Sequence, residues 1–154
     1  MNSELAQPFI NSFLSIFPQI GFESVHKVGI TEIGKNIESP GVNVIIGMVG
    51  NLKGNVIYGM SEDCAKTIAS TMMMGMEVTE FDAMAQSAVS ELCNMLTATT
   101  STEFTSMDIK TDISTPTLMY GNFTASASYE HVIQIEMQLL DFPFFIYFSL
   151  EKNS

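Results

Sequence analysis

The C-terminal third of the chain holds the pattern that most constrains the fold: two neighbouring segments in which apolar and polar residues alternate. The first segment runs from Ile133 to Leu139 and the second from Phe144 to Leu150, with a proline-containing break at 141–143 between them. Successive side chains of a strand point to opposite faces, so this period of two predicts two strands with one face on a core. Because the break is short, we expect the strands to pair antiparallel.

The remaining patterns predict helices and strands that come in groups. Strands are expected at 24–33, 42–49, 54–60 and 107–113, and the glycine-bounded connection at 50–54 suits a hairpin turn. Helices are expected from Ser3 to Pro18, from the N-cap Ser61 to Met74, and from Thr79 to about Thr100. No internal repeat is recognisable. Strands in consecutive runs favour an α+β fold, a mostly antiparallel sheet with helices on one face, as a single domain over 1–154.

Charge excludes several kinds of partner. The chain has 17 acidic residues against six lysines and no arginine, for a net charge of −11. Such a surface repels phosphate backbones and anionic lipids, so we expect no nucleic acid and no membrane as partner. It also lacks the arginine forks with which proteins grip phosphate. If this protein acts on phosphate, the cations must come from its partner.

The sequence offers little for a metal or a disulfide. Cys64 and Cys93 lie in helical patterns without a CxxC motif, and His26 and His131 stand alone in strand-like segments. We therefore expect no bound cofactor and no metal ligands in this chain. The first residues carry no basic region and no apolar run long enough for a membrane helix follows, so we expect a cytoplasmic protein.

The third predicted helix carries its polar residues on one ridge. At about 100° per residue, with Ser87 at 0°, Glu91 falls at about 40°, Asn94 at about −20° and Ala98 at about 20°. The apolar stripe is centred roughly 130° away from this ridge. The helix should therefore pack by one side and present Ser87, Glu91 and Asn94 outward, although an outward Glu and Asn on a helix are by themselves usually only a solvated face.

The segment from Ser87 to Leu96 resembles the signature of the CheC/CheX phosphatases. In that family a Ser or Asp precedes a Glu by four residues, an Asn follows the Glu by three, and a Pro comes some two dozen residues later. Here these positions hold Ser87, Glu91, Asn94 and Pro116. The opening helix, the strand from Gly54 into the next helix, and the late strand pair are also similar, so the resemblance covers most of the chain. The predicted second helix has no Glu-x-x-Asn, which fits the single-site CheX branch.

The resemblance implies a reaction and roles for the matching residues. Members of the family remove the phosphoryl group from the aspartate of a response-regulator receiver domain. By this analogy Asn94 orients the attacking water and Glu91 docks to the receiver's active-site lysine, while the receiver holds the Mg²⁺. Ser87 would be a contact residue. Ser90 and Ala98 stand where relatives often carry glycine, and both are small enough for close approach of the partner.

Two features of assembly are also expected. The resemblance implies a homodimer, and the apolar C-terminal strands are candidates for its exposed sheet edge. The 12 methionines, clustered at 72–76 and along the third helix, are either core filler or an adaptable contact surface.

Two alternatives to an enzyme remain open at this stage. The chain could be a non-catalytic module that binds a receiver or joins a signalling complex with the same fold. It could also be an unrelated ligand-binding domain with an accidental Glu-x-x-Asn, which would require a closed apolar pocket.

Overall fold

The computed structural model describes residues 3–153, so Met1 and Asn2, which entered the expectation about a signal sequence, lie outside the described residues. Its helices are a short 3₁₀ turn η1 (Ser3–Leu5), α1 (Ala6–Ile20), α2 (Glu62–Met72) and α3 (Ala83–Thr105). Its strands are β1 (Val25–Ile33), β2 (Asn36–Glu38), β3 (Val42–Gly50), β4 (Leu52–Met60), β5 (Thr111–Ile113), β6 (Thr117–Tyr120), β7 (Thr124–Ser126), β8 (Val132–Leu139) and β9 (Phe142–Lys152).

Within residues 3–153 the strands form one seven-stranded sheet and a small ribbon. The large sheet has the order β1-β8-β9-β4-β3, and β5 and β6 both pair with the outer edge of β3. Every pairing is antiparallel. β2 and β7 pair with each other as a separate ribbon. The antiparallel pair predicted from the alternating C-terminal segments is confirmed as β8 and β9.

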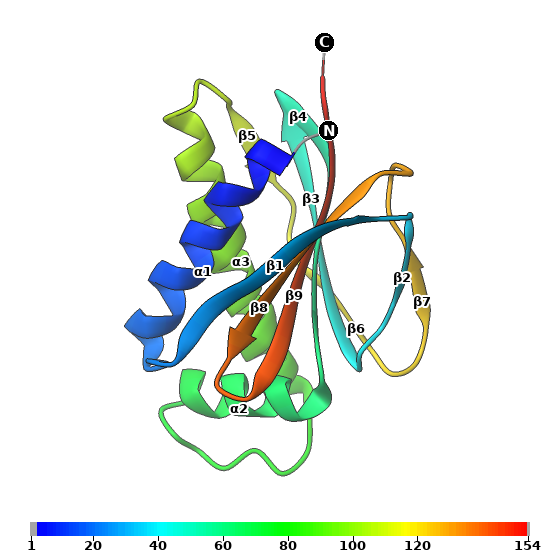
Figure 1. Cartoon of the computed structure of the whole chain (residues 1–154). Helices are drawn as coiled ribbons and strands as arrows, with labels where there is room; N and C mark the ends of the chain where they lie inside the picture. Colours follow the sequence, from blue (N-terminus) through cyan, green and yellow to red (C-terminus); the bar gives the residue numbers. More distant parts are fainter. Residues whose placement is uncertain (1–2, 154) are drawn as a thin grey trace.

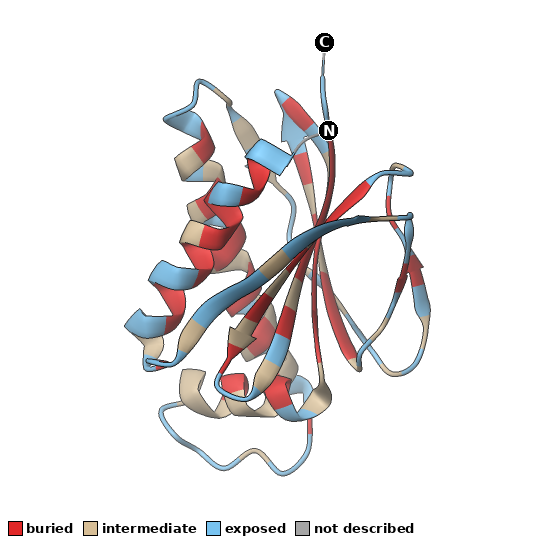
Figure 2. Ribbon diagram, in the orientation of Figure 1, coloured by how far each residue is buried: buried red, intermediate tan, exposed pale blue. Residues whose placement is uncertain are grey.

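The helices α1 and α3 lie on one side of the sheet and the β2–β7 ribbon lies on the other (Figure 1). The buried face of the sheet meets aromatic side chains of α1, because the Phe9 ring stacks on Phe148 at 4.9 Å between centroids and Phe13 packs on Phe144 at 5.3 Å. Such aromatic pairs contribute beyond the area that they bury. A second, smaller cluster that includes Ile57 and Tyr147 fills the space under the ribbon. The buried residues thus run along both the helices and the central strands (Figure 2).

The fold contains an internal repeat that the sequence pattern did not reveal. The first half consists of α1 followed by β1, β2, β3 and β4. The second half consists of α3 followed by β5 and β6, which together match β1, and then by β7, β8 and β9. If each strand is replaced by its match, the sheet order is the same from either end. The ends of the two helices match in detail. The Phe22 N–H donates to the Phe17 carbonyl at 3.0 Å, and 87 residues later the Ile109 N–H donates to the Phe104 carbonyl at 3.0 Å. α3 has 23 residues and is longer than α1, which has 15.

Several predicted boundaries and one predicted edge are wrong. Asp82 caps the third helix, not Thr79, because its side chain accepts from the Ala85 N–H, and the helix continues to Thr105. The predicted strand at 107–113 is only β5, since the chain turns at 106–110. β8 and β9 lie inside the sheet and not at its edge, because β1 covers β8 and β4 covers β9.

Candidate functional site

The helix α3 is built to hold one face rigidly against the core. Asp82 satisfies a backbone N–H at its start, with the acceptor oxygen 2.9 Å from the Ala85 nitrogen, an interaction that typically contributes about 1 kcal/mol. Its apolar side is buried, with Val89 and Leu92 wholly inaccessible. The opposite side of this 23-residue helix is therefore held in a fixed orientation.

Buried hydroxyl groups add directional contacts beneath the ridge. The Tyr58 hydroxyl lies 2.7 Å from the Thr97 hydroxyl, and Thr97 donates to the Cys93 carbonyl at 2.8 Å. On the α1 side, the Ser12 and Thr100 hydroxyls lie 2.8 Å apart. Burial raises the pKa of the Tyr58 phenol, which therefore stays neutral. Sequence reasoning missed these residues, since a threonine in a helix gives no sign of which buried hydroxyl it will meet.

The ridge predicted by the helical wheel is present. Ser87, Glu91 and Ala98 are exposed, and Ser90 and Asn94 are half-buried, on the side of α3 away from its packed face. Among residues 3–153, none forms a hydrogen bond or ion pair with the side chain of Glu91 or Asn94. Both side chains therefore present their full hydrogen-bonding capacity outward.

Pro116 of the signature belongs to a segment that the fold brings against α3, although it is distant from Asn94 in the chain. It immediately precedes β6, and both β5 and β6 contact α3. β6 in turn braces the start of α3, because the Tyr120 ring packs on Phe81 at 5.4 Å. The Tyr120 hydroxyl donates to Glu62 Oε1 at 2.8 Å, which links the same strand to the start of α2. The two strands that flank the proline thus pack against α3, the helix that carries the ridge.

Cysteine and histidine side chains supply no second reactive centre near this ridge. Cys64 and Cys93 are free and buried, and burial raises the pKa of the Cys64 thiol to about 12. Among the described residues, no three His, Cys, Asp or Glu side chains come close enough to hold a metal ion. His131 does have a partner, contrary to the expectation that it stands alone, since its Nδ1 lies 2.9 Å from Glu32 Oε2.

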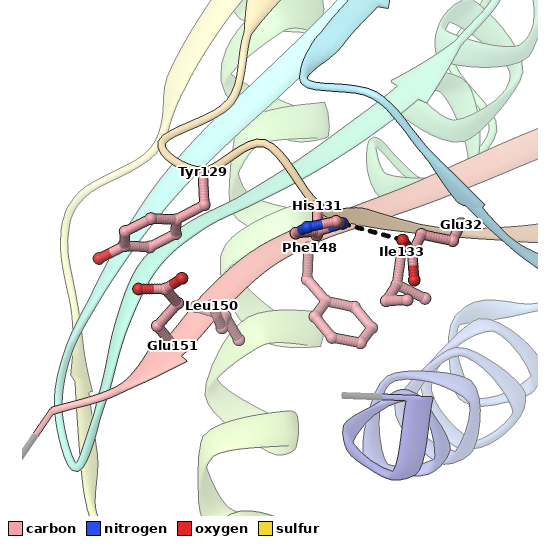
Figure 3. Close-up of a pocket in the computed structure, with 7 residues that line it drawn as sticks. All are labelled: Glu32, Tyr129, His131, Ile133, Phe148, Leu150 and Glu151. Carbon is pink, nitrogen blue, oxygen red and sulfur yellow. Dashed lines mark hydrogen bonds and ion pairs between the residues drawn. The ribbon is translucent and has the colours of Figure 1, made fainter. Parts of the chain in front are cut away.

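The His131–Glu32 pair lies in a surface pocket of about 360 Å³, whose floor includes Ile133 and Phe148 (Figure 3). The rim carries Tyr129 and Glu151, so the pocket is open and partly charged rather than closed and apolar. No residue of the α3 ridge lines it. Across residues 3–153, no helix is both long and apolar enough to cross a bilayer.

Comparison with known proteins identifies relatives over nearly the whole chain. The family model described as chemotaxis phosphatase CheX matches residues 42–138. The CheY-P phosphatase CheX of Thermotoga maritima is 28% identical over 141 residues, which cover 90% of each chain.

Solved structures of similar proteins have the same fold. The chemotaxis protein CheX from Desulfovibrio desulfuricans superposes with a TM-score of 0.87 at 20% identity, over 96% of this chain and 99% of that one. A chain in the CheX–CheY–BeF₃–Mg²⁺ complex from Borrelia burgdorferi superposes with a TM-score of 0.77 at 19% identity, over 96% and 98%. The expected α+β fold of the CheC type is thereby confirmed. With a family model that matches most of its length, this chain belongs to the CheX family of chemotaxis phosphatases.

Proposed function

We propose that this protein hydrolyses the phosphoaspartate of a cytoplasmic response-regulator receiver domain, with Asn94 and Glu91 as the residues that act on the partner. The observation that carries the proposal is the ridge itself. A rigidly seated helix presents a carboxylate and an amide one turn apart, and neither is engaged by another described residue. Membership of the CheX family supplies the substrate class.

In this reaction the chain would mainly position the attacking water. A water molecule attacks the phosphorus, the bond between phosphorus and the aspartate oxygen breaks, and inorganic phosphate and a free carboxylate result. The transition state is loose, so catalysis consists mainly of alignment and charge stabilisation. The Asn94 amide has a donor and an acceptor, which suits it to hold the attacking water in line.

Glu91 is proposed to anchor the helix on the partner. The α3 helix contains two glutamates and neither lysine nor arginine, so it has no cation of its own with which to bind phosphate. A carboxylate at Glu91 would pair with the lysine beside the receiver's phosphorylation site. The receiver would also supply the Mg²⁺ that stabilises the phosphoryl oxygens. This division of labour explains how a chain of net charge −11 can act on phosphate.

The small residues around this pair would allow the two proteins to approach closely. Ser87 lies one turn before Glu91, Ser90 flanks it, and Ala98 follows Asn94 by one turn. We propose these three as contact residues of the partner interface. A larger side chain at any of them would hold the helix away from the receiver's site.

The test is the decay of a radiolabelled phospho-receiver from the same genome. Substoichiometric protein should accelerate the decay with multiple turnovers, and Asn94→Ala should abolish most of the acceleration while receiver binding stays measurable. Asn122→Ala, on an exposed loop, is the matched control and should behave as the wild type. Slower decay, or acceleration that stops at one equivalent, would instead identify a non-catalytic receiver-binding module.

The homodimer is retained as a proposal with a different edge from the one expected. β1 is an outer strand of the large sheet and carries two exposed apolar residues, Val28 and Ile30. Pairing of β1 with its copy would extend the sheet. Light scattering should then show a dimer for the wild type and a monomer for Val28→Lys.

A further inference from the structure

Three methionines stand out because most of each side chain is exposed. Met74 is 96% exposed, Met84 62% and Met76 59%, and these are the most exposed large apolar side chains among the described residues. We call this group, Met74, Met76 and Met84, the methionine surface. Neighbouring Met72 and Met73 behave in the opposite way, since both pack against the core. The exposure is therefore particular to these positions and not a property of the whole methionine cluster.

Met84 extends the ridge of α3 toward the start of the helix. Met84 lies on α3 about 20° from Glu91 around the helix axis and two turns, or about 10 Å, before it. Met74 and Met76 lie on the connection that leads from α2 into α3, which is mostly exposed (Figure 2). A partner that covers Glu91 and Asn94 and extends past the start of α3 toward the connection would meet Met84 first.

Backbone geometry gives the start of this connection a sharp turn. Met74 has φ of 61° and Gly75 φ of 86°, so the chain turns in the left-handed region directly after α2. The Gly75 N–H donates to the Ser70 carbonyl at 2.8 Å, which closes the end of the helix. A non-glycine residue at such a φ is uncommon and is a defined turn rather than loose chain.

Charge around the methionines indicates the chemistry of the partner. Between residues 67 and 109 the chain has six carboxylates and no lysine or arginine. Of these, Glu77, Glu80 and Asp82 are exposed and lie between Met76 and Met84 in the chain. The surface thus combines polarisable apolar contacts with negative charge, which complements a partner face that is basic and partly apolar.

We infer that the methionine surface is a second docking region for the same receiver domain that Glu91 and Asn94 serve, and that it sets affinity rather than the rate of the chemical step. This inference rests on the proposed function. Methionine side chains are unbranched and adapt to differently shaped partners. The region would therefore let one phosphatase accept more than one receiver, provided that each carries apolar and basic residues beside its phosphorylation site.

The test compares two double variants in the phospho-receiver assay. Met76→Gln with Met84→Gln should raise KM about tenfold and leave kcat within about twofold of wild type, as expected for residues that contribute to binding alone. The matched control is Met107→Gln with Met119→Gln, two exposed methionines outside this surface, and it should leave both constants unchanged. Glutamine has about the length of methionine and, at Met84 in α3, about its helix propensity. All four positions are exposed, so all variants should fold.

The inference would be overturned if the first double variant had the KM of the control double variant, in an assay where the wild type is active. Titration of a beryllofluoride-treated receiver, which is not consumed, should show the same tenfold loss in affinity. If the first double variant changes only the oligomeric state by light scattering, the surface serves a second copy of this chain and the inference is wrong. A wild type that fails to accelerate decay would instead contradict the proposed function.

Discussion

The two long helices that cover the sheet occupy equivalent places in the repeat but present different chemistry. Going back 87 residues from Glu91 and Asn94 leads to Glu4 and Gln7, so the first half carries a Glu-x-x-Gln where the second carries a Glu-x-x-Asn. Gln7 is engaged within the chain, since its amide donates to Asn11 Oδ1 at 2.8 Å. Asn94 has no such partner among residues 3–153.

The two halves also differ at the signature proline and at the start of the helix. Gly29, at a strand bulge in β1, stands where the second half has Pro116. The N-cap residue of α1 is Leu5, which makes no side-chain cap, whereas Asp82 caps α3. The comparison teaches that the repeated backbone offers two equivalent helix faces. Among residues 3–153, the amide at this position is without a partner only on α3, and of the two helices only α3 has a side-chain cap at its start.

The largest expected effect is on the rate of dephosphorylation, when Asn94 of α3 is replaced by glutamine, the residue at the equivalent position of α1. Asn94→Gln keeps the amide but adds a methylene, which moves the amide by more than 1 Å from where it holds the water. Misplacement of that size commonly costs about 100-fold in rate. Single-turnover decay of the phospho-receiver measures it, and a rate near that of wild type would show that the position of this amide is not critical.

Charge reversal at the paired glutamates is expected to have the next largest effect. Glu91→Lys should raise KM about tenfold or more, because it places a second cation against the receiver's lysine. Glu4→Lys makes the same change in charge at the equivalent place and should leave KM within about twofold. Steady-state kinetics with both variants checks the comparison, and equal effects of the two would mean that only the net charge of the protein matters.

Loss of the buried hydroxyl contact under α3 should cost stability rather than binding. Tyr58→Phe removes the 2.7 Å contact with Thr97, while Thr97 keeps its bond to the Cys93 carbonyl. We expect about 1 kcal/mol less free energy of unfolding. α1 has Ile10 at the position of Thr97, so Ile10 has no such contact to lose. Urea denaturation measures the change, and no loss would show that the hydroxyl pair is energetically neutral.

Removal of the α3 cap is a related and slightly smaller perturbation. Asp82→Ala should reduce the free energy of unfolding by about 1 kcal/mol or less, since one backbone N–H loses its acceptor. Hydrogen exchange should accelerate in the first turn of α3 and not in α1, which has no side-chain cap to lose. Uniform exchange across both helices would contradict this local effect.

The smallest expected effect is on turnover, when Gln7 of α1 is replaced by asparagine, the residue at the equivalent position of α3. Gln7→Asn completes a Glu-x-x-Asn on the first helix, yet we expect less than about twofold change in turnover. Glu4 lies in the 3₁₀ turn before α1 rather than within a regular helix, and Gly29 replaces the proline. Turnover by the double variant Gln7→Asn with Asn94→Ala measures α1 alone, and restored activity would show that two residues suffice to make a site.

Local patterns were enough for much of the fold. The period of two placed β8 and β9, and Ser61 caps α2 as expected, with its hydroxyl accepting from the Cys64 N–H at 3.1 Å. The helical wheel placed Glu91 and Asn94 on one outward ridge, because the angle between residues on a helix depends only on their spacing. The roles of these two residues stay predictions, as do those of Ser87, Ser90 and Ala98.

Long-range contacts decided the rest. The sequence by itself determined which residues share a face, because strand and helix periods are local properties of the backbone. Only the tertiary structure placed β8 and β9 inside the sheet, paired β2 with β7, and revealed the repeat, since pairing partners far apart in the chain leave no local signal. It also showed that Gln7 bonds to Asn11 while no residue of the described chain bonds to the Asn94 side chain, because a side chain's partner depends on what the fold brings beside it.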